Sequence, residues 1–502
     1  MLYRQRHDTF IRHYDDVGYI VNEGMLADRV VDPAGAVFLD ALSRSPQSIE
    51  AITETIRRSF VDAPEDLIDD VQSFYGILEA DGFIVSGNTS EELDEKDEVL
   101  SQIRHSLAQQ TGTDSASVIR SERDTQSYLS EHFKDNPHLV SLQLELTSKC
   151  NERCVHCYIP HELKNVEMDT ALFQDVIEQS NDMGLLSLTL SGGEPLAHSR
   201  IKEILRLLRD YDFSIRVLSN LTLLDDGILE EMRHLKVASI KVSLYSMNPE
   251  VHDSITQLPG SHEKTIRSIE KLVDNGFNVI INCPTMKENR NDLKGVLEWG
   301  QMRGIRAVTD YIMMARYDRT DDNLEHRLSL DEIEPLIRNV IEGDKEYRTR
   351  ILTADFKKEL ERDVSNDPVC GVCVSSLCMV PNGNLYPCAG WQSFVLGNVR
   401  KGSLREIWET SERVLYLRRL RRRDFEKCMK CNDRIFCSMC MVRNANENPD
   451  GNPLIVNEHF CKVAALNRRV VEEWIDSNKP SCETAACANN QAEKTEEPEE
   501  RR

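Results

Sequence analysis

Three cysteines on one short segment are the residues with the clearest potential for chemistry. Cys150, Cys154 and Cys157 form a C-x3-C-x2-C pattern directly after the apolar run 139–146. A structural zinc site normally brings four protein ligands, whereas three thiolates on one loop leave one metal position open to another ligand. The spacing therefore predicts a metal centre that also binds a small molecule, with a purely structural or zinc-binding triplet as the alternative.

A glycine-rich turn follows the next apolar run, 185–190. It consists of Ser191, Gly192, Gly193, Glu194 and Pro195. Glycine lets the backbone approach a ligand closely, and a glutamate can accept a hydrogen bond from a ligand ammonium group. By itself such a segment is an ordinary turn. One strand after the cysteine triplet, it predicts a ligand site beside the metal.

Most of the remaining cysteines lie near the C-terminus. Of the fifteen in the chain, nine lie between residues 370 and 461, and Cys283, Cys482 and Cys487 stand apart. The N-terminal residues lack the apolar core of an export signal, so we expect a cytoplasmic protein with reduced thiols. The clustered cysteines are therefore predicted to be metal ligands. Because C-x2-C pairs bind zinc well, a zinc ribbon is the alternative for this segment.

Composition argues against nucleic-acid and membrane partners. The chain has 85 acidic and 61 basic residues and a net charge of -24. A polyanion would be repelled by most of such a surface. No stretch offers the eighteen or so apolar residues of a membrane span. We expect no nucleic acid and no membrane among the partners.

Residues 137–330 alternate short apolar runs with amphipathic segments, which is typical of repeated βα units around a parallel sheet. Six repeats are too few for a closed eight-stranded barrel, so we expect an α/β fold, a partial (β/α)6 TIM-like barrel. In such sheets the chemistry lies at the C-terminal ends of the strands. The strand candidates are 139–146, 185–190, 213–218, 238–244, 277–282 and 307–313.

The segments on either side are predicted to form further domains. Residues 1–90 are expected to form a winged-helix-like α+β domain of three strands, at 9–14, 18–22 and 29–32, and three helices, the last from Pro64 to about 80. DNA binding is disfavoured because residues 1–90 carry seven Arg, no Lys and sixteen acidic residues. The expected remainder is a linker at 91–136, connecting helices at 331–365, a Cys-rich domain held together by metal at 366–465, and a C-terminal helix with a disordered tail at 466–502.

The cysteine triplet and the Gly-Gly-Glu-Pro turn, each after a barrel strand, resemble the radical S-adenosylmethionine (SAM) superfamily. The resemblance implies that Cys150, Cys154 and Cys157 bind a [4Fe-4S] cluster whose fourth iron is chelated by SAM. It also implies that Gly192, Gly193, Glu194 and Pro195 hold the methionine amino group, and that Asn220 and Ser243, at later strand ends, contact SAM. In this family, reductive cleavage of SAM yields a 5'-deoxyadenosyl radical that abstracts a hydrogen atom from the substrate.

The C-terminal cysteines, with Gly383 five residues before Cys388, resemble the SPASM domain, which carries two auxiliary [4Fe-4S] clusters. That resemblance assigns Cys370, Cys378, Cys388 and Cys440 to the first auxiliary cluster and Cys428, Cys431, Cys437 and Cys461 to the second. The step from Cys437 to Cys440 contains two residues where three is usual, and Cys373 could replace Cys370 or Cys378. The expected cofactors are therefore SAM and three [4Fe-4S] clusters.

Residues 1–90 resemble the peptide-recognition domain of ribosomal-peptide maturation systems, which adds a leader peptide as an extra strand. The whole chain then resembles a maturase that oxidatively cross-links a ribosomally made precursor peptide, with a thioether as the first choice. The expected partners are this precursor and an electron donor such as flavodoxin or ferredoxin. Alternatives are carbon-carbon cross-linking, epimerisation, maturation of a protein to formylglycine, and a zinc-stabilised peptide-binding scaffold. The sequence indicates no catalytic side chain.

Overall fold

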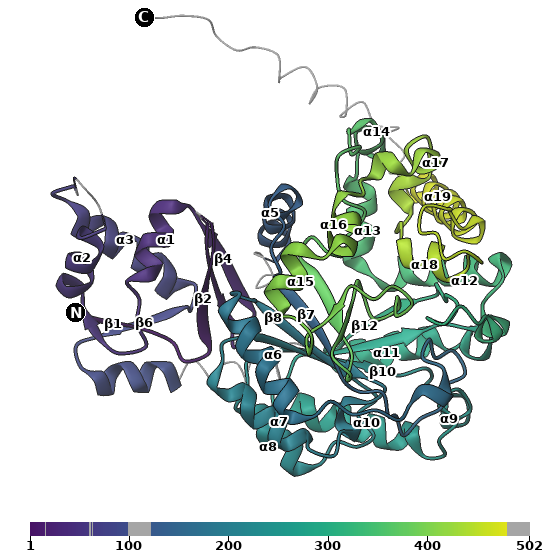
Figure 1. The fold of residues 1–502 in the computed structure, drawn as a ribbon, viewed down its shortest axis with the longest axis horizontal. Helices are drawn as coiled ribbons and strands as arrows, with labels where there is room; N and C mark the ends of the chain where they lie inside the picture. The colour runs from purple at the N-terminus through teal and green to yellow at the C-terminus, as the bar shows by residue number, and fades with distance from the viewer. Residues whose placement is uncertain (16, 60–61, 63, 99–121, 479–502) are drawn as a thin grey trace, which may run out of the picture. The chain divides into compact units, whose positions relative to one another are not determined.

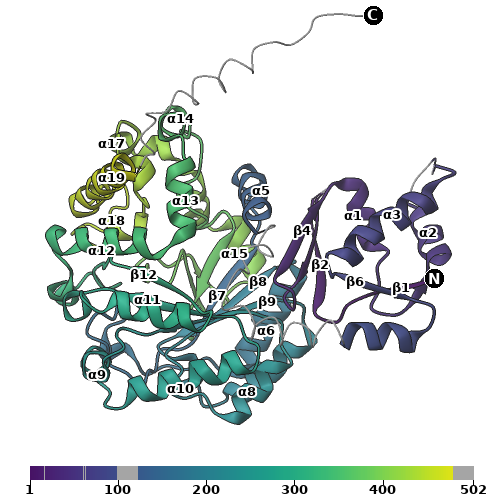
Figure 2. The ribbon, with the colours of Figure 1, turned by 180° about the vertical axis from the view of Figure 1, so that it is seen from behind.

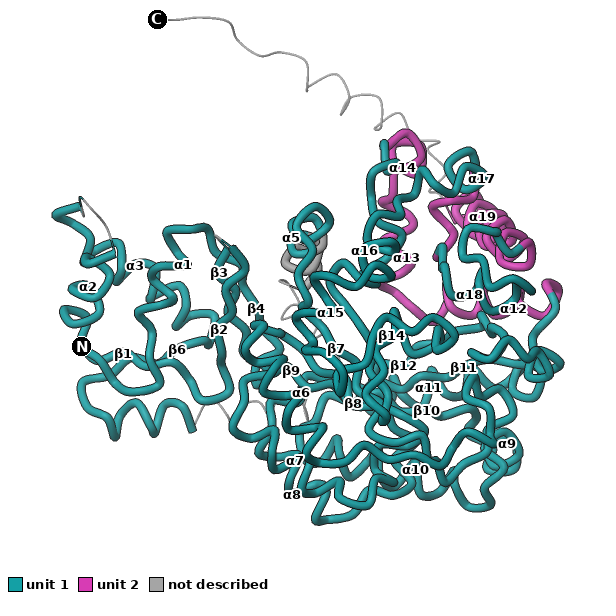
Figure 3. Tube along the Cα trace, viewed as in Figure 1, with its two compact units in different colours: residues 1–329, 363–431, 439–457 teal, residues 330–362, 432–438, 458–502 magenta. Residues whose placement is uncertain are grey.

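The computed structural model describes all residues except 16, 60–61, 63, 99–121 and 479–502. The chain forms two compact units (Figure 3). The first contains residues 1–329, 363–431 and 439–457, and the second contains residues 330–362, 432–438 and 458–502. Cys482 and Cys487 lie outside the described residues. Within the described ranges, no helix is both long and apolar enough to cross a membrane.

The N-terminal residues form a small α+β domain. The three predicted strands are present as β2 (Thr9–Tyr14), β3 (Val17–Asn22) and β4 (Ala27–Val31), paired in that order. The three helices are α1 (Pro33–Asp40), α2 (Ile49–Arg57) and α3 (Leu67–Ala80). The side chains of Asp32 and Ser48 cap α1 and α2 by accepting backbone N–H groups.

A second sheet in this domain was not predicted. It consists of β1 (Leu2–Gln5), β5 (Gln47–Ser48) and β6 (Ile84–Gly87), in the order β5-β1-β6. These strands are short, and the pairing joins segments more than 40 residues apart, so local periodicity gives little sign of it. Asp97, which is 3% exposed, accepts a hydrogen bond from Arg6 (2.8 Å), so the packing of this domain extends past residue 90.

The predicted partial barrel is present. Its six strands are β7 (Ser141–Thr147), β8 (Ser187–Gly192), β9 (Ser214–Ser219), β10 (Val237–Ser243), β11 (Val279–Pro284) and β12 (Arg306–Asp310). They pair in parallel, each with its neighbour in sequence. Helices line the outside of the sheet (Figures 1 and 2): α6 (Thr170–Asp182), α7 (Ile201–Leu207), α8 (Asp226–Arg233), α10 (Ser261–Asp274) and α11 (Leu293–Met302). The loops that follow the strands therefore meet at one edge.

The Cys-rich segment extends this sheet, which the sequence did not predict. Strands β13 (Ser376–Met379), β14 (Asn384–Tyr386) and β15 (Gly397–Asn398) follow β7, giving the order β12-β11-β10-β9-β8-β7-β13-β14-β15. Because β13 lies parallel to β7, Cys378 pairs with Gln143. Gly383, with a φ of 86°, forms the turn between β13 and β14. Helices α15 (Leu404–Thr410), α16 (Glu412–Arg419), α17 (Glu426–Met429) and α18 (Met441–Asn446) complete this part of the first unit.

The second unit is helical. It contains α12 (Leu330–Gly343), α13 (Lys345–Thr353), α14 (Phe356–Glu361) and α19 (Glu458–Asn478). Helices α12 and α19 are joined by ion pairs from Arg338 to Glu473 (2.7 Å) and from Arg469 to Glu334 (2.6 Å). Because these four side chains are partly exposed, the pairs contribute little to stability, and the apolar contacts between the helices contribute more.

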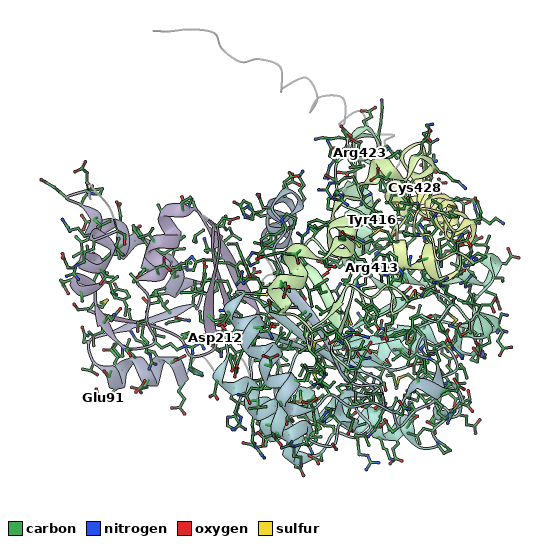
Figure 4. All side chains as sticks on the ribbon, viewed as in Figure 1. Glu91, Asp212, Arg413, Tyr416, Arg423 and Cys428 are labelled. Atoms are coloured by element: carbon green, nitrogen blue, oxygen red, sulfur yellow. The ribbon has the colours of Figure 1, made fainter. Side chains whose placement is uncertain are left out.

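The N-terminal domain contacts the barrel through two arginines and an apolar cluster. Arg12 donates to the backbone carbonyl groups of Leu185 (2.9 Å) and Asp212, and Arg44 pairs with the Asp212 side chain (2.6 Å), which Figure 4 labels at this junction. Around them Phe10, Tyr14, Tyr19, Val21, Leu129, Phe133, Val140, Leu186 and Val374 form one buried cluster. Leu129 and Phe133 lie on α5 (Glu122–Asp135), within the predicted linker.

Candidate active site

The cysteine triplet lies on the loop that follows β7, where the sequence predicted it. The Cys157 N–H donates to the Cys154 carbonyl oxygen (3.1 Å), and the Glu152 N–H approaches the Cys150 sulfur (3.4 Å). Burial raises the pKa of the Cys150 thiol to about 12 and also raises the pKa of the Cys154 thiol. Buried thiolates need a nearby positive charge, which a bound iron ion would supply.

The glycine-rich turn packs directly on the start of this loop. Gly192 has a φ of 141°, and a Cβ added there would overlap the Thr147 carbonyl oxygen. A Cβ on Gly193 would overlap the carbonyl oxygens of Ser148 and Lys149. The Gly193 and Glu194 N–H groups donate to the carbonyl oxygens of Thr147 (2.8 Å) and Lys149 (2.9 Å). Both glycines are thus required for the turn to hold the backbone that leads into Cys150.

The Glu194 side chain joins the ends of β8 and β9. Its side chain is 1% exposed and accepts hydrogen bonds from the Ser219 hydroxyl (2.7 Å), the Asn220 N–H (2.7 Å) and the Leu196 N–H (3.0 Å). Asn220 in turn donates to the Asn151 side chain (3.1 Å) on the cysteine loop. Burial raises the pKa of Glu194 to about 7, against the lowering effect of these donors. A carboxylate accepts up to four hydrogen bonds, so Glu194 keeps capacity for a donor from a ligand.

Two further acidic side chains at this site were not predicted. Glu152 lies 3.3 Å from the Cys154 sulfur, and Glu145, on β7, accepts from the Tyr158 hydroxyl (3.3 Å) and the Gln392 amide (3.0 Å). Burial raises the pKa of each to about 7. In the described part of the chain neither forms an ion pair with Lys or Arg. A signal for Glu145 was present, since it shares the polar face of the strand Ser141–Thr147 with Gln143.

The end of β10 completes this edge of the sheet. Ser243 is its last residue, and Tyr245 follows, with its hydroxyl 3.9 Å from the Cys154 sulfur and 3.5 Å from His156 Nε2. Burial lowers the pKa of His156 to about 4, so the ring is neutral at physiological pH. The structure thus brings Ser243 to the same edge as the triplet, with Tyr245 between them and in contact with Cys154.

The four cysteines predicted for the first auxiliary cluster lie near one another in the first unit. Burial is the main cause that raises the pKa of Cys370 and of Cys388, and the neighbouring Cys440 thiol also raises both. The pKa of Cys388 is raised to about 12. Burial, Glu145 and Cys388 raise the pKa of Cys378. The Asn446 amide on α18 donates to the Gly390 carbonyl oxygen (2.9 Å) and so joins the helix that Cys440 begins to the loop after Cys388.

Other cysteines lie as follows. Cys373 is fully buried with a φ of 57°, and its carbonyl oxygen accepts from Arg418 (2.9 Å). Cys283, which stands apart in the sequence, is fully buried in β11. The cysteines predicted for the second auxiliary cluster are divided between the two units. In the first unit, Cys428 lies on α17 (Figure 4) and Cys431 follows this helix, whereas Cys437 and Cys461 belong to the second unit.

The donor set suits iron-sulfur clusters. Among the described residues, no three Cys, His, Asp or Glu side chains are grouped to hold a single metal ion. A four-iron cluster takes one thiolate at each iron corner, so its thiolates do not need to converge on a single point. The triplet would leave one iron of such a cluster open, and the buried Glu194 would offset the charge of a cationic ligand beside it.

Comparisons with known proteins match these features to two families. Residues 144–300 match the radical SAM superfamily, and residues 350–432 match SPASM, an iron-sulfur cluster-binding domain. The chain thus contains a radical SAM domain and a SPASM domain. The radical SAM domain thus contains the cysteine triplet and the glycine-rich turn, and the SPASM match contains the cysteines from 370 to 431.

The similar proteins differ in how much of this chain they match. An AdoMet-dependent heme synthase of Methanosarcina barkeri is 29% identical over 61% of this chain and 92% of its own length. The subtilosin biosynthesis protein AlbA of Bacillus subtilis is 27% identical over 62% of this chain and 69% of its own. The structure of Streptococcus suis SuiB bound to precursor peptide SuiA has a TM-score of 0.59 and 16% identity, over 91% of this chain and 99% of its own. It shares the fold.

Proposed function

We propose that the protein is a radical SAM/SPASM maturase that oxidatively cross-links a ribosomally synthesised precursor peptide, with a thioether as the bond formed. The observation that carries the proposal is the N-terminal domain beside the barrel. The structural match to SuiB covers 91% of this chain. The part it leaves out is shorter than the N-terminal domain, so the match includes some of that domain. The sequence match to the heme synthase covers much less of the chain. We propose the domain boundaries that the sequence predicts, except that the first domain extends past residue 90. We also place the protein in the cytoplasm.

The leader peptide would bind at β4. This strand is an edge of the sheet β2-β3-β4, and an extended peptide can pair with such an edge. Arg29 on β4 forms an ion pair with Asp81, at the end of α3. The same helix presents Ile77, which is 47% exposed, and Phe74, which packs edge to face on Phe38. An apolar leader side chain could pack on this surface while its backbone extends the sheet.

The cofactors would be SAM and three [4Fe-4S] clusters. Cys150, Cys154 and Cys157 would hold the first cluster, and Gly192–Pro195, Asn220 and Ser243 would hold SAM, with Glu194 facing its ammonium group. When bound, SAM supplies the radical that removes a substrate hydrogen atom. Cys370, Cys378, Cys388 and Cys440, and then Cys428, Cys431, Cys437 and Cys461, would hold the auxiliary clusters. These would accept the substrate electron, and flavodoxin or ferredoxin would reduce the first cluster.

Anaerobic reconstitution tests the cofactor assignment. We expect about twelve iron atoms per chain and little zinc, because three four-iron clusters form. Replacing Cys150, Cys154 and Cys157 together by alanine should remove about four of them and abolish formation of deoxyadenosine from SAM. The zinc-stabilised scaffold would instead give a colourless protein without this activity.

Peptide binding is tested with a synthetic peptide encoded by a short reading frame beside the gene. Ile77→Asp should weaken binding of the peptide by about tenfold, because it places a charge on the apolar surface of α3. Met302→Asp is the matched control, since Met302 is 74% exposed on α11 of the barrel. Equal affinity of the two variants would contradict leader binding at β4. A loss of two hydrogen atoms from the mass of the treated peptide reports an oxidative cross-link, and loss of a free thiol identifies that cross-link as a thioether.

A further inference from the structure

Five arginines lie in the run from Arg418 to Arg423, which begins at the end of α16. Three of them have partners for their side chains. Arg418 donates to the Cys373 carbonyl oxygen (2.9 Å), and Arg421 donates to the Arg418 carbonyl oxygen. Arg423, which Figure 4 labels, donates to the Asn366 side chain. These three arginines join parts of the SPASM domain to one another.

Arg422 has a buried nitrogen atom without a partner. It is a partly buried residue whose Nε is shielded from solvent and forms no hydrogen bond. In the part of the chain that the structure describes, its guanidinium group also forms no ion pair with Asp or Glu. A buried N–H group is costly unless an acceptor faces it, and a buried charge is costly unless it is paired. The Arg422 side chain is therefore suited to an anion that also accepts hydrogen bonds.

Backbone hydrogen bonds place Arg422 close to Cys370. The Arg422 N–H donates to the Asp367 carbonyl oxygen (3.0 Å), and the Arg423 N–H donates to the Ser365 carbonyl oxygen (3.0 Å). These two bonds tie the arginine run to the segment that leads into Cys370. Burial raises the pKa of the Cys370 thiol, and the positive charge of Arg422 opposes this rise. Arg422 therefore acts on one of the four cysteines predicted for the first auxiliary cluster.

The other cysteines of this group have acidic neighbours. Burial, Glu145 and the Cys388 thiol raise the pKa of Cys378. Burial and the Cys440 thiol raise the pKa of Cys388. Four thiolate ligands carry more negative charge than a [4Fe-4S] core carries positive charge, so a bound cluster is itself an anion. Because a buried anion needs a nearby positive charge, Arg422 fits beside such a cluster.

We propose that Arg422 stabilises the first auxiliary cluster, with its Nε–H donating to a cluster sulfur and its positive charge offsetting the charge of the bound cluster. This inference rests on the cofactors of the proposed function. Hydrogen bonds to the sulfur atoms and the net charge of the site set the reduction potential of an iron-sulfur cluster. Reduction adds one electron to the cluster, so a fixed cation stabilises the reduced form more than the oxidised form. Arg422 therefore raises the reduction potential of this cluster.

The alternative role for Arg422 is structural, as a side chain that packs on the segment before Cys370. Two variants separate the roles. Arg422→Gln keeps a hydrogen-bond donor and removes the charge, whereas Arg422→Lys keeps the charge and changes the shape of the side chain. Arg419→Gln is the matched control, because Arg419 belongs to the same run and is exposed at the end of α16.

The experiment is a dithionite titration of the full-length protein, reconstituted without peptide and followed by electron paramagnetic resonance. Cys150, Cys154 and Cys157 are replaced by alanine in the parent and in every variant, so that the auxiliary clusters are observed without the SAM cluster. Arg422→Gln should lower the equilibrium constant for reduction of one auxiliary cluster about tenfold, which is about 59 mV for one electron. Arg422→Lys should stay within about threefold of the parent, and Arg419→Gln within about twofold.

Iron analysis accompanies the titration, and the parent should contain about eight iron atoms. Equal reduction potentials in Arg422→Gln and Arg419→Gln would overturn the proposal. Loss of about four iron atoms in Arg422→Gln but not in Arg422→Lys would support it, because only the charge differs, and the same loss in both variants would show a structural role instead. Because no peptide is used, these results hold even if the enzyme leaves the peptide unaltered. A parent protein with zinc and no iron would overturn both the proposed cofactors and the role of Arg422.

Discussion

Replacing Gly192 by alanine tests whether the glycine-rich turn positions the cysteine loop. Gly192 has a φ of 141°, a conformation that costs other residues about 1–3 kcal/mol. A Cβ would also lie 3.2 Å from the Thr147 backbone nitrogen and carbonyl carbon and would overlap the carbonyl oxygen. Because these are backbone atoms, they cannot rotate away. The strain must displace residues 147–149, which lead directly into Cys150.

Gly184→Ala is the matched control. Gly184 also has a positive φ, 71°, but nothing lies within 4 Å of an added Cβ. Its alanine variant should lose about 1–2 kcal/mol, from the left-handed conformation alone. Gly192→Ala should lose more than about 4 kcal/mol, the size expected of a severe clash. The difference of at least about 2 kcal/mol corresponds to a further fall in Tm of about 4–8 °C for a domain of this size.

Thermal unfolding and iron analysis of the two variants after anaerobic reconstitution measure the effect. Gly184→Ala should keep its full iron content, and Gly192→Ala should lose about four iron atoms, because Cys150 is displaced from the SAM cluster. Equal Tm values and equal iron contents in the two variants would refute the claim that the turn holds the cysteine loop.

Three further predictions concern stability. Because the pKa of Glu145 is raised to about 7, folding binds a proton between about pH 4.5 and 7. Glu145→Gln should therefore gain stability relative to wild type as the pH rises through this window, by on the order of 3 kcal/mol. Urea unfolding of the metal-free proteins at pH 5 and pH 8 measures this gain, and a constant difference in stability between the two proteins would contradict it. Arg12→Met should lower the stability of the contact between the N-terminal domain and the barrel by about 1–3 kcal/mol, because the partly buried carbonyl groups of Leu185 and Asp212 lose a charged donor. Calorimetry should show the N-terminal domain unfolding at a lower temperature, and an unchanged trace would refute the prediction. Asp169→Ala should cost about 1 kcal/mol because Asp169 caps α6 by accepting from the Leu172 N–H (2.8 Å), and a Tm equal to that of wild type would show that the cap contributes nothing.

Local patterns were sufficient for most of the elements. The strand predicted at 9–14 coincides with β2, and the six barrel strands are offset by one to three residues. Apolar alternation and helix caps such as Asp32 act within a few residues of sequence, so they can be read without the fold. For the same reason the motifs that identify the radical SAM and SPASM domains were visible, since the cysteine triplet and the glycine-rich turn each lie on one loop and the C-terminal cysteines come in short runs.

The sequence alone therefore determined which residues can do chemistry: Cys150, Cys154 and Cys157, the turn at Gly192–Pro195, and the C-terminal cysteines. Only the tertiary structure decided how they are arranged. The pairing of β13 with β7 brings Cys378 beside the barrel strand, and Glu145 meets Gln392 across 247 positions of sequence. Such pairings are set by the burial of whole elements and the satisfaction of buried polar groups, which depend on the complete fold rather than on any local pattern.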